Sequence, residues 1–377
     1  MPRLNRNALV VGAGIGGLSA ALTLATNGWK VDVAEIKEEN FTVGVGINHP
    51  ANALRALQRL GVYDEVAAAG YHYQGIRRFG AGGRLIEEFR PTDPPDVPFQ
   101  ISMTRADLHA ILTKAVTDRG VKLRLATTWT DFTDGPDGVT VELSDGSRNR
   151  YDIMVGADGI RSPLRTRLFP GNDPVATGYA CWRLAVRRQP DMVLSEYWNS
   201  GQAKATVLHL NAETMYLLVV EAGSWSHIPE RSAMSRMLVD RLRPMGGLIA
   251  YVRDTIRPDS DIHWAVLEEV FLPSPWFKGH VVLIGDAAHA VTPHLAQGAG
   301  MAMEDAIVLA ETLDGAEVPQ ALETFMARRY ERVKYVQDQA HAILVNEMEP
   351  DPQAKAAFAA ALGARQQEIT ARLSVPA

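Results

Sequence analysis

Short apolar runs that alternate with helical spacing organise the first part of the chain. Ala8–Val11 is an aliphatic run typical of a buried strand, and Leu18–Leu24 follow it at helical spacing. Lys30–Ala34 is a second aliphatic run. A strand, a helix and a strand in this order predict a βαβ unit. Tyr151–Gly156 and Val281–Ile284 predict further buried strands, the second of parallel type.

Helical periodicity predicts most of the remaining elements. Residues 50–69 predict one or two helices, broken by Gly61, and Thr104–Asp118 predicts a helix with Thr104 as N-cap. Further helices are predicted near Ala233–Leu242, at Gly298–Leu313 and Pro319–Asn346, and in an Ala-rich segment from Ala354. Residues 178–270 are otherwise rich in strand patterns. We therefore expect an α/β fold, in which a Rossmann-like cofactor domain carries an inserted mixed-sheet domain and ends in helices.

Composition places the domain boundaries. Glycines and prolines gather between Tyr71 and Pro98, which predicts an excursion into a second domain and back. We assign residues 1–71, 98–177 and 271–346 to a discontinuous cofactor domain, residues 72–97 and 178–270 to a substrate-binding domain, and residues 347–377 to a C-terminal helical tail.

Composition and charge narrow the class of protein. The chain has 377 residues, 46% hydrophobic and 22% charged, and a net charge of -6, which disfavours nucleic acid as a partner. Its single cysteine, Cys181, allows no intrachain disulfide and no cysteine-based metal cluster. The N-terminal apolar run is interrupted by glycines, and no run of about 18 apolar residues follows. We expect a cytoplasmic protein with no membrane partner and no metal, as a monomer or homodimer.

A glycine-rich motif joins the first predicted strand to the first helix. In Gly12-Ala-Gly14-Ile-Gly16-Gly17, Gly12 makes the tight turn, Gly14 lets the backbone approach a pyrophosphate, and Gly17 lets helix and strand pack closely. Glu35, after the next strand, is placed to accept the hydroxyls of an adenosine ribose. This unit predicts a dinucleotide site but does not distinguish NAD from FAD.

Two later segments make the distinction. They are the run Asp152-Ile-Met-Val-Gly-Ala-Asp158-Gly-Ile-Arg-Ser-Pro-Leu-Arg165, and the run Gly285-Asp286-Ala-Ala-His289 with its continuation from Thr292 through Pro293, His294, Gly298 and Ala299 to Ala306. With the first motif, and at these distances, they resemble the FAD-dependent aromatic hydroxylases, the class A flavoprotein monooxygenases similar to para-hydroxybenzoate, salicylate and 6-hydroxynicotinate hydroxylases. The resemblance covers the chain through about Arg332.

The resemblance implies roles for individual residues. Asp286 would bind the ribityl hydroxyls of FAD, Asp158 belongs to a segment associated with both FAD and NAD(P)H, and Arg105 matches an arginine near the FAD linker. Gly44–Asn52 resembles the segment beside the isoalloxazine ring, where Gly46 lets the backbone lie close. Pro293 stands in the flavin-facing loop. The helix that starts at Gly298 and Ala299 has a dipole that can stabilise an anionic reduced flavin.

The resemblance also implies the reaction. FAD is reduced by NADH or NADPH, reacts with O2 to give a C4a-hydroperoxide, and hydroxylates a small hydroxylated aromatic or pyridine carboxylic acid, with decarboxylation in some cases. Two other readings remain: a hydroxylase-fold enzyme acting on a non-aromatic substrate, as an epoxidase or N-hydroxylase, and an FAD-binding protein without catalysis.

Four residues are catalytic candidates on the substrate side. His294 is the first, because the ordinary pKa of histidine suits proton transfer near neutrality. Asn48, His209 and Tyr216 lie on segments expected to line the pocket. Arg183, in a Gly-Tyr-x-x-Trp-Arg run that resembles the salicylate hydroxylases, is a candidate with His294 for binding the substrate. Two roles stay open for Arg183: it attracts a carboxylate, or it supports the flavin loop.

Overall fold

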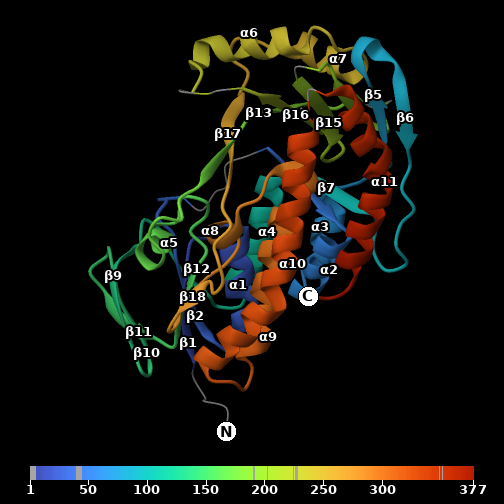
Figure 1. Cartoon of the computed structure of the whole chain (residues 1–377). Helices are drawn as coiled ribbons and strands as arrows, with labels where there is room; N and C mark the ends of the chain where they lie inside the picture. Colours follow the sequence, from blue (N-terminus) through green and yellow to red (C-terminus); the bar gives the residue numbers. More distant parts are fainter. Residues whose placement is uncertain are drawn as a thin grey trace.

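The computed structural model describes residues 6–39, 45–189, 192–201, 203–223, 225, 228–347, 349 and 351–377. Within these ranges a six-stranded sheet, here the parallel sheet, forms the base of the molecule (Figure 1). Its strands in spatial order are β18 (Phe277–Lys278), β19 (Val281–Leu283), β12 (Ile153–Gly156), β1 (Asn7–Val11), β2 (Lys30–Ala34) and β8 (Lys122–Arg124). Apart from β18, neighbouring strands run parallel. The continuous apolar runs of β1 and β12 are buried because parallel sheets are covered on their faces.

The helices outside residues 178–270 pack on the parallel sheet and on each other. They are α1 (Ile15–Thr26), α2 (Ala51–Leu60), α3 (Tyr63–Ala69), α4 (Arg105–Asp118), α5 (Pro163–Leu168), α8 (Asp286–His289), α9 (Gly298–Leu313), α10 (Val318–Glu347) and α11 (Pro352–Ser374), with the 3₁₀ turn η2 (Pro293–Leu295) before α9. Thr104 caps α4 by accepting from the Asp107 N–H at 3.0 Å, as predicted. Gly61 separates α2 from α3 with a left-handed conformation. No described helix has a segment long and apolar enough to cross a membrane.

A second large sheet, here the mixed sheet, lies at the opposite end of the molecule beneath α6 (Arg231–Leu242) and α7 (Gly247–Thr255) (Figure 1). In the described part of the chain its seven strands are β17 (His263–Glu269), β13 (Val175–Arg187), β16 (Thr214–Ala222), β15 (Ala203–His209), β14 (Ser195–Asn199), β5 (Ile76–Phe79) and β6 (Leu85–Phe89), and the 3₁₀ turn η1 (Ala81–Gly83) joins the last two. All pairs are antiparallel except β14 with β5. The excursion of the early chain therefore joins a sheet built from the later insertion, as the composition indicated.

Two small sheets complete the fold. One contains β3 (Gly46–Pro50), β7 (Gln100–Thr104) and β4 (Tyr71–His72), and the other contains β11 (Arg148–Tyr151), β10 (Gly138–Leu143) and β9 (Trp129–Gly135). The predicted α/β class, with a Rossmann-like domain, a mixed-sheet insertion and C-terminal helices, is confirmed. Some details differ: β13 already begins at Val175, and the helices α5, α7 and α8 were not predicted. The exact domain limits stay a prediction.

Candidate active site

The glycine-rich turn has the geometry that the motif predicts. Gly12 has φ +100°, and a Cβ there would lie 2.5 Å from the Ala157 carbonyl oxygen. A Cβ on Gly17 would lie 1.9 Å from the Gly12 carbonyl oxygen, so only glycine permits the packing of α1 on β1. Gly14 faces open space, and a Cβ on Gly16 would lie 3.3 Å from Ala302 of α9. The turn is thus both constrained by its neighbours and accessible at Gly14.

Two acidic residues flank this turn. Glu35 directly follows β2, and its carboxylate accepts from the Ala13 N–H at 2.7 Å and from the Lys37 N–H at 3.0 Å. Asp158 follows β12; one carboxylate oxygen accepts from the Leu164 N–H at 3.1 Å, while the other is buried without a hydrogen-bond partner. Burial raises the pKa of Asp158. Both acids therefore lie at the carboxyl edge of the parallel sheet, where dinucleotides bind in such folds.

The Gly285–Asp286 loop rests on a buried ionic network. Asp305 accepts from the Gly285 N–H at 2.9 Å, from His289 Nε2 at 2.6 Å and from Arg329 Nε at 2.7 Å. Although burial opposes ionisation, His289 and Arg329 hold the pKa of Asp305 below its usual range. His289 therefore has a structural role, and the network fixes the loop that carries Asp286.

Asp286 and Arg105 lie near enough for their charges to interact. Asp286 is accessible, yet the surrounding protein raises the pKa of its carboxyl by desolvation. Burial lowers the pKa of Arg105, and the Asp286 carboxylate opposes that shift. The Nε atom of Arg105 is buried without a hydrogen-bond partner. A group that is both accessible and desolvated lines an enclosed space rather than an outer surface. This space beside Asp286 and Arg105 is here called the recess.

Strand β3 brings the cofactor domain against the mixed sheet. A Cβ at Gly46 would lie 2.8 Å from the Tyr216 ring and 2.9 Å from Leu210, so glycine allows this close approach. Asn48 shares the face of Gly46, because side chains alternate along a strand, and its Oδ1 is buried without a hydrogen-bond partner. Gly44 lies outside the described residues. The structure thus brings Asn48 and Tyr216 to the same side of β3.

The face of the mixed sheet that meets β3 carries polar groups. Arg183 on β13 and Tyr216 on β16 are diagonal neighbours and form a side-chain hydrogen bond. Burial raises the pKa of Tyr216 to about 12, so its phenol stays protonated at neutral pH. On β15, Lys204 pairs with Val220 while Leu208 pairs with Tyr216, which places Lys204 on the same face. The opposite face packs on α6 and α7.

His294 lies in η2, on the loop that precedes α9, and its electrostatic partner is Lys204. Burial and the Lys204 charge lower the pKa of His294 to about 2. The expectation that this imidazole titrates near neutrality was therefore wrong, because a protonated ring would be desolvated beside a cation. His294 remains a candidate for contact with the substrate as a neutral imidazole.

Pro293, Gly298 and Ala299 lie in or directly after the loop that precedes α9, whereas His209 lies elsewhere, at the end of β15. Pro293 starts η2, and Gly298 and Ala299 form the first turn of α9, whose N-cap Gln297 exchanges two hydrogen bonds of 2.9 Å with Asn52. On β15, Leu208 pairs with Tyr216, so the next residue, His209, points to the opposite face of the sheet. The His209 ring stacks on Tyr71, with 4.9 Å between the ring centroids. The structure therefore separates His209 from the Tyr216 side of the sheet.

Sequence reasoning overlooked Lys204 and Arg329. Lys204 is buried on β15, whose other residues are mostly apolar. A lysine within such an apolar strand is unusual, and this could have marked Lys204 as a functional residue. Arg329 lies in the middle of α10 and is fully buried between Glu304 and Asp305. Its helix shows charged residues on several sides, so nothing in the local pattern marked this arginine as buried.

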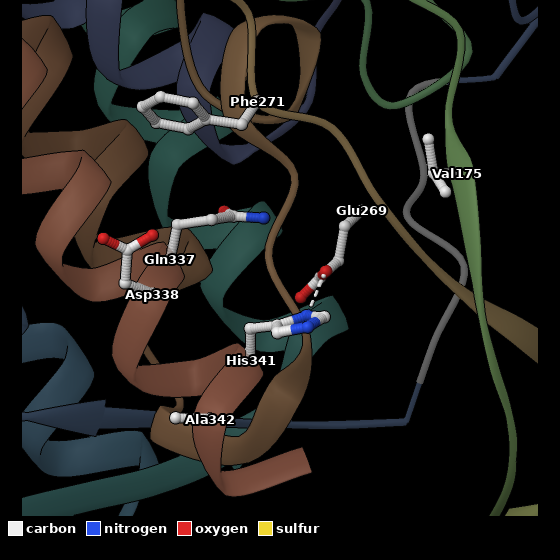
Figure 2. Close-up of a pocket in the computed structure, with 7 residues that line it drawn as sticks. All are labelled: Val175, Glu269, Phe271, Gln337, Asp338, His341 and Ala342. Atoms are coloured by element: carbon white, nitrogen blue, oxygen red, sulfur yellow. Dashed lines mark hydrogen bonds and ion pairs between the residues drawn. The ribbon is translucent and has the colours of Figure 1, made fainter. Parts of the chain in front are cut away.

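A separate hollow of about 380 Å³ lies between α10 and the segment around β17 (Figure 2). Val175, Glu269, Phe271, Gln337, Asp338, His341 and Ala342 line it. His341 Nδ1 contacts Glu269 Oε2 at 2.8 Å, and the dashed line in Figure 2 marks this contact. The residues that the sequence singled out do not line this hollow, so it is not the candidate active site.

The residues present fit FAD. The turn at Gly12–Gly17 ends at the N-terminus of α1, which favours a pyrophosphate. The unpartnered Nε of Arg105 and the desolvated Asp286 can hold the linker and a polyol chain, respectively. The first turn of α9 presents backbone N–H groups beside η2. These donors and acceptors lie between the glycine-rich turn and the mixed sheet.

Comparisons with known proteins agree with this fit. The family model described as FAD binding domain matches residues 5–340. The putative FAD-dependent monooxygenase YetM of Bacillus subtilis is 31% identical over 356 residues, covering 93% of this chain and 96% of that protein. The 3-hydroxybenzoate 6-hydroxylase 1 of Aquipseudomonas alcaligenes is 32% identical, covering 89% of this chain and 87% of that protein.

Among solved structures, Klebsiella pneumoniae HpxO complexed with FAD and uric acid aligns with a TM-score of 0.88 at 23% identity, over 98% of this chain and 96% of that chain. At this identity the likeness shows the fold alone. The family match and the two relatives show the family as well as the fold, because they extend over nearly the whole chain. This chain belongs to the FAD binding domain family and is an FAD-dependent monooxygenase of the aromatic hydroxylase type.

Proposed function

We propose that this chain hydroxylates the ring of a small hydroxylated aromatic or pyridine carboxylic acid, with NAD(P)H as reductant and with or without loss of the carboxyl group. In each simple hydroxylation NAD(P)H, a proton and O2 are consumed, and NAD(P)⁺, water and the hydroxylated ring are formed. The 3-hydroxybenzoate hydroxylase relative supports this substrate class.

The observation that carries the proposal is the charge of the recess. Arg105, Arg183 and Lys204 supply cations there, and Asp286 is the acid that acts on Arg105. Hydroxylated ring acids are anions near neutral pH, so a cation-rich recess favours them over neutral molecules. Leu208 and Leu210 pack with Tyr216 and give the recess an apolar wall suited to a ring.

When bound, FAD accepts hydride and activates oxygen, and the protein orients the substrate and stabilises charge. The N–H groups of Gly298 and Ala299 stabilise negative charge at the start of α9. The Tyr216 phenol, held by Arg183, stays protonated and donates a hydrogen bond to the substrate. Neutral His294 and Asn48 Oδ1 can accept hydrogen bonds from a ring hydroxyl.

We also propose that the nicotinamide approaches transiently across the groove near Asp158. The support is the Asp158 carboxylate oxygen that is buried without a hydrogen-bond partner at the carboxyl end of β12. A ligand that donates a hydrogen bond there would satisfy this oxygen.

Stopped-flow reduction of the bound flavin tests the proposed function. The FAD-loaded protein is mixed with NADH or NADPH, with and without each member of a panel of hydroxybenzoates and hydroxypyridine carboxylates. We expect a ring acid to accelerate flavin reduction at least about tenfold and to yield a hydroxylated product with O2, identified by mass. Slow reduction with every ring acid, together with rapid reduction by a non-aromatic compound, would overturn the substrate class.

A further inference from the structure

We propose that Lys204 binds the anionic oxygen of the substrate and thereby selects ring acids over their neutral analogues. The inference rests on the proposed function, since it concerns ligands of the same recess. It assigns the anion to a residue on β15, whereas the sequence had pointed to Arg183 on β13.

The position of Lys204 follows from strand register. Lys204 pairs with Val220 on β16 and with Asn199 on β14, so it lies in the interior of the mixed sheet. Its neighbours Ala203 and Ala205 point to the α6 and α7 face, because they belong to that core. Lys204 therefore points to the other face, which carries Tyr216 and meets the cofactor domain.

The residue across from Lys204 comes from the flavin-facing loop. The Lys204 charge acts on His294 of η2, although the two residues are far apart in sequence and belong to different domains. A ligand oxygen held by Lys204 would consequently lie beside the loop that precedes α9. This loop is the segment that the sequence predicts to face the flavin.

Burial gives the ammonium a reason to bind an anion. Lys204 is 8% exposed, and burial lowers its pKa from 10.5 to about 7. A buried ammonium attracts an anionic ligand more strongly than an exposed one, because the low-dielectric surroundings screen the attraction less. Neutral analogues lack this attraction, so the site discriminates by charge.

Arg183 has a different task in this arrangement. Its guanidinium forms a hydrogen bond with Tyr216, and its charge acts on Arg105 beside Asp286. It holds the Tyr216 phenol and adds positive charge where the cofactor binds. Lys204 is the cation whose charge acts on the loop residue His294.

Equilibrium binding to the FAD-loaded protein tests the inference without turnover. The probes are 3-hydroxybenzoate, 6-hydroxynicotinate, benzoate and phenol, with 3-hydroxybenzamide and 6-hydroxynicotinamide as neutral controls, titrated by the change in flavin absorption. The variants are Lys204→Met, which keeps the length of the side chain, and Lys204→Arg, which keeps the charge. Retained flavin absorption and a cooperative thermal transition confirm that each variant is folded.

We expect the wild-type protein to bind at least one acid about tenfold or more tightly than its amide, as a charge-assisted hydrogen bond implies. Lys204→Met should bring that ratio close to one by weakening the acid alone, and Lys204→Arg should restore much of it. Loss confined to carboxylates identifies the carboxylate as the bound oxygen. Loss that extends to neutral phenol and to the amides would overturn the inference, because it would show that Lys204 does not select by charge.

A wild-type protein with no preference for acids over amides would overturn the inference, and so would a Lys204→Met variant that keeps the preference. These results are distinct from a failure of the proposed function. If Lys204 binds ring acids that never accelerate flavin reduction, only the reaction is wrong. If ring acids are hydroxylated while Lys204→Met retains the anion preference, only the role of Lys204 is wrong.

Discussion

Arg329 donates from Nε to Asp305 Oδ1 at 2.7 Å, and both side chains are fully buried. The other oxygen of Asp305 accepts from the Gly285 N–H at 2.9 Å. The pair thus connects the long helix α10 to the loop that carries Asp286. A residue remote from the predicted motifs therefore holds a loop on which one of the predicted cofactor ligands lies.

Arg329→Met should unfold more easily and lose FAD. Removing the cation leaves Glu304 and Asp305 buried with one ion-pair partner fewer each, which typically costs roughly 3–5 kcal/mol. Thermal unfolding and the ratio of flavin to protein absorption after purification measure the two effects. The control is Arg328→Met, since Arg328 is partly exposed and pairs with Glu311. Equal losses in both variants would contradict the role given to Arg329.

Gly46→Val should impair the active site while the rest of the fold persists. The new side chain would push β3 away from the Tyr216 ring, which already lies within 2.8 Å of an added Cβ. We expect roughly 1–3 kcal/mol of destabilisation, typical of overpacking, and weaker binding of ring acids. Gly135→Val on β9 is the control, because a Cβ there has its nearest contact at 3.6 Å. Unchanged ligand affinity in Gly46→Val would refute the close approach.

Lys204→Met should raise the thermal midpoint of the ligand-free protein. Burial lowers the lysine pKa from 10.5 to about 7, so below pH 7 the folded protein keeps a disfavoured charge that the unfolded chain carries at no penalty. As pH rises from 7 toward 10.5 the folded lysine loses its proton first, and the penalty fades. The gain, on the order of a few kcal/mol, should therefore be largest below pH 7 and small near pH 10.

Differential scanning calorimetry of wild type and Lys204→Met across this pH range measures the effect. Lys114→Met provides the matched control, because Lys114 is exposed and pairs with Asp118 on the surface of α4. Its substitution should shift the midpoint little at any pH. A gain for Lys204→Met that is independent of pH would show that packing, and not the charge, is responsible.

Asp158→Ala should weaken the use of NAD(P)H, the flavin content, or both. The carboxylate has one oxygen on the Leu164 N–H and one without a partner, so its removal affects both the start of α5 and any ligand near it. Steady-state kinetics with NADH and NADPH and the flavin content measure these effects. Asp131→Ala, an exposed site on β9, is the control. An unchanged Michaelis constant together with unchanged flavin content would remove Asp158 from the site.

The cofactor half of the site could be read from local sequence. The roles of Gly12 and Gly17 depend on contacts within one strand-turn-helix unit, and the cap of α4 depends on Thr104 and Asp107, three residues apart. Such features follow from steric limits and hydrogen bonds between near neighbours. They are therefore visible as motifs with fixed spacing.

The arrangement of the candidate substrate residues could not be predicted from local sequence. Asn48, Lys204, Tyr216 and His294 come from four separate elements, and only the register of β15 and β16 and the packing of β3 on Tyr216 bring them to one recess. His209 looked equivalent to Tyr216, but a shift of a single position along a strand turns a side chain to the opposite face. The sequence pattern did not determine which face met the cofactor domain.

By itself, therefore, the sequence determined the fold class, the family and the cofactor, because those depend on short segments with strict backbone requirements. The tertiary structure decided which polar side chains lie on the same face of the mixed sheet and how burial changes their pKa values. His294 has the ordinary chemistry of histidine in the sequence, and only its burial beside Lys204 lowers its pKa to about 2. Desolvation and long-range charge depend on what surrounds a residue, and that is set by the folded arrangement of distant elements.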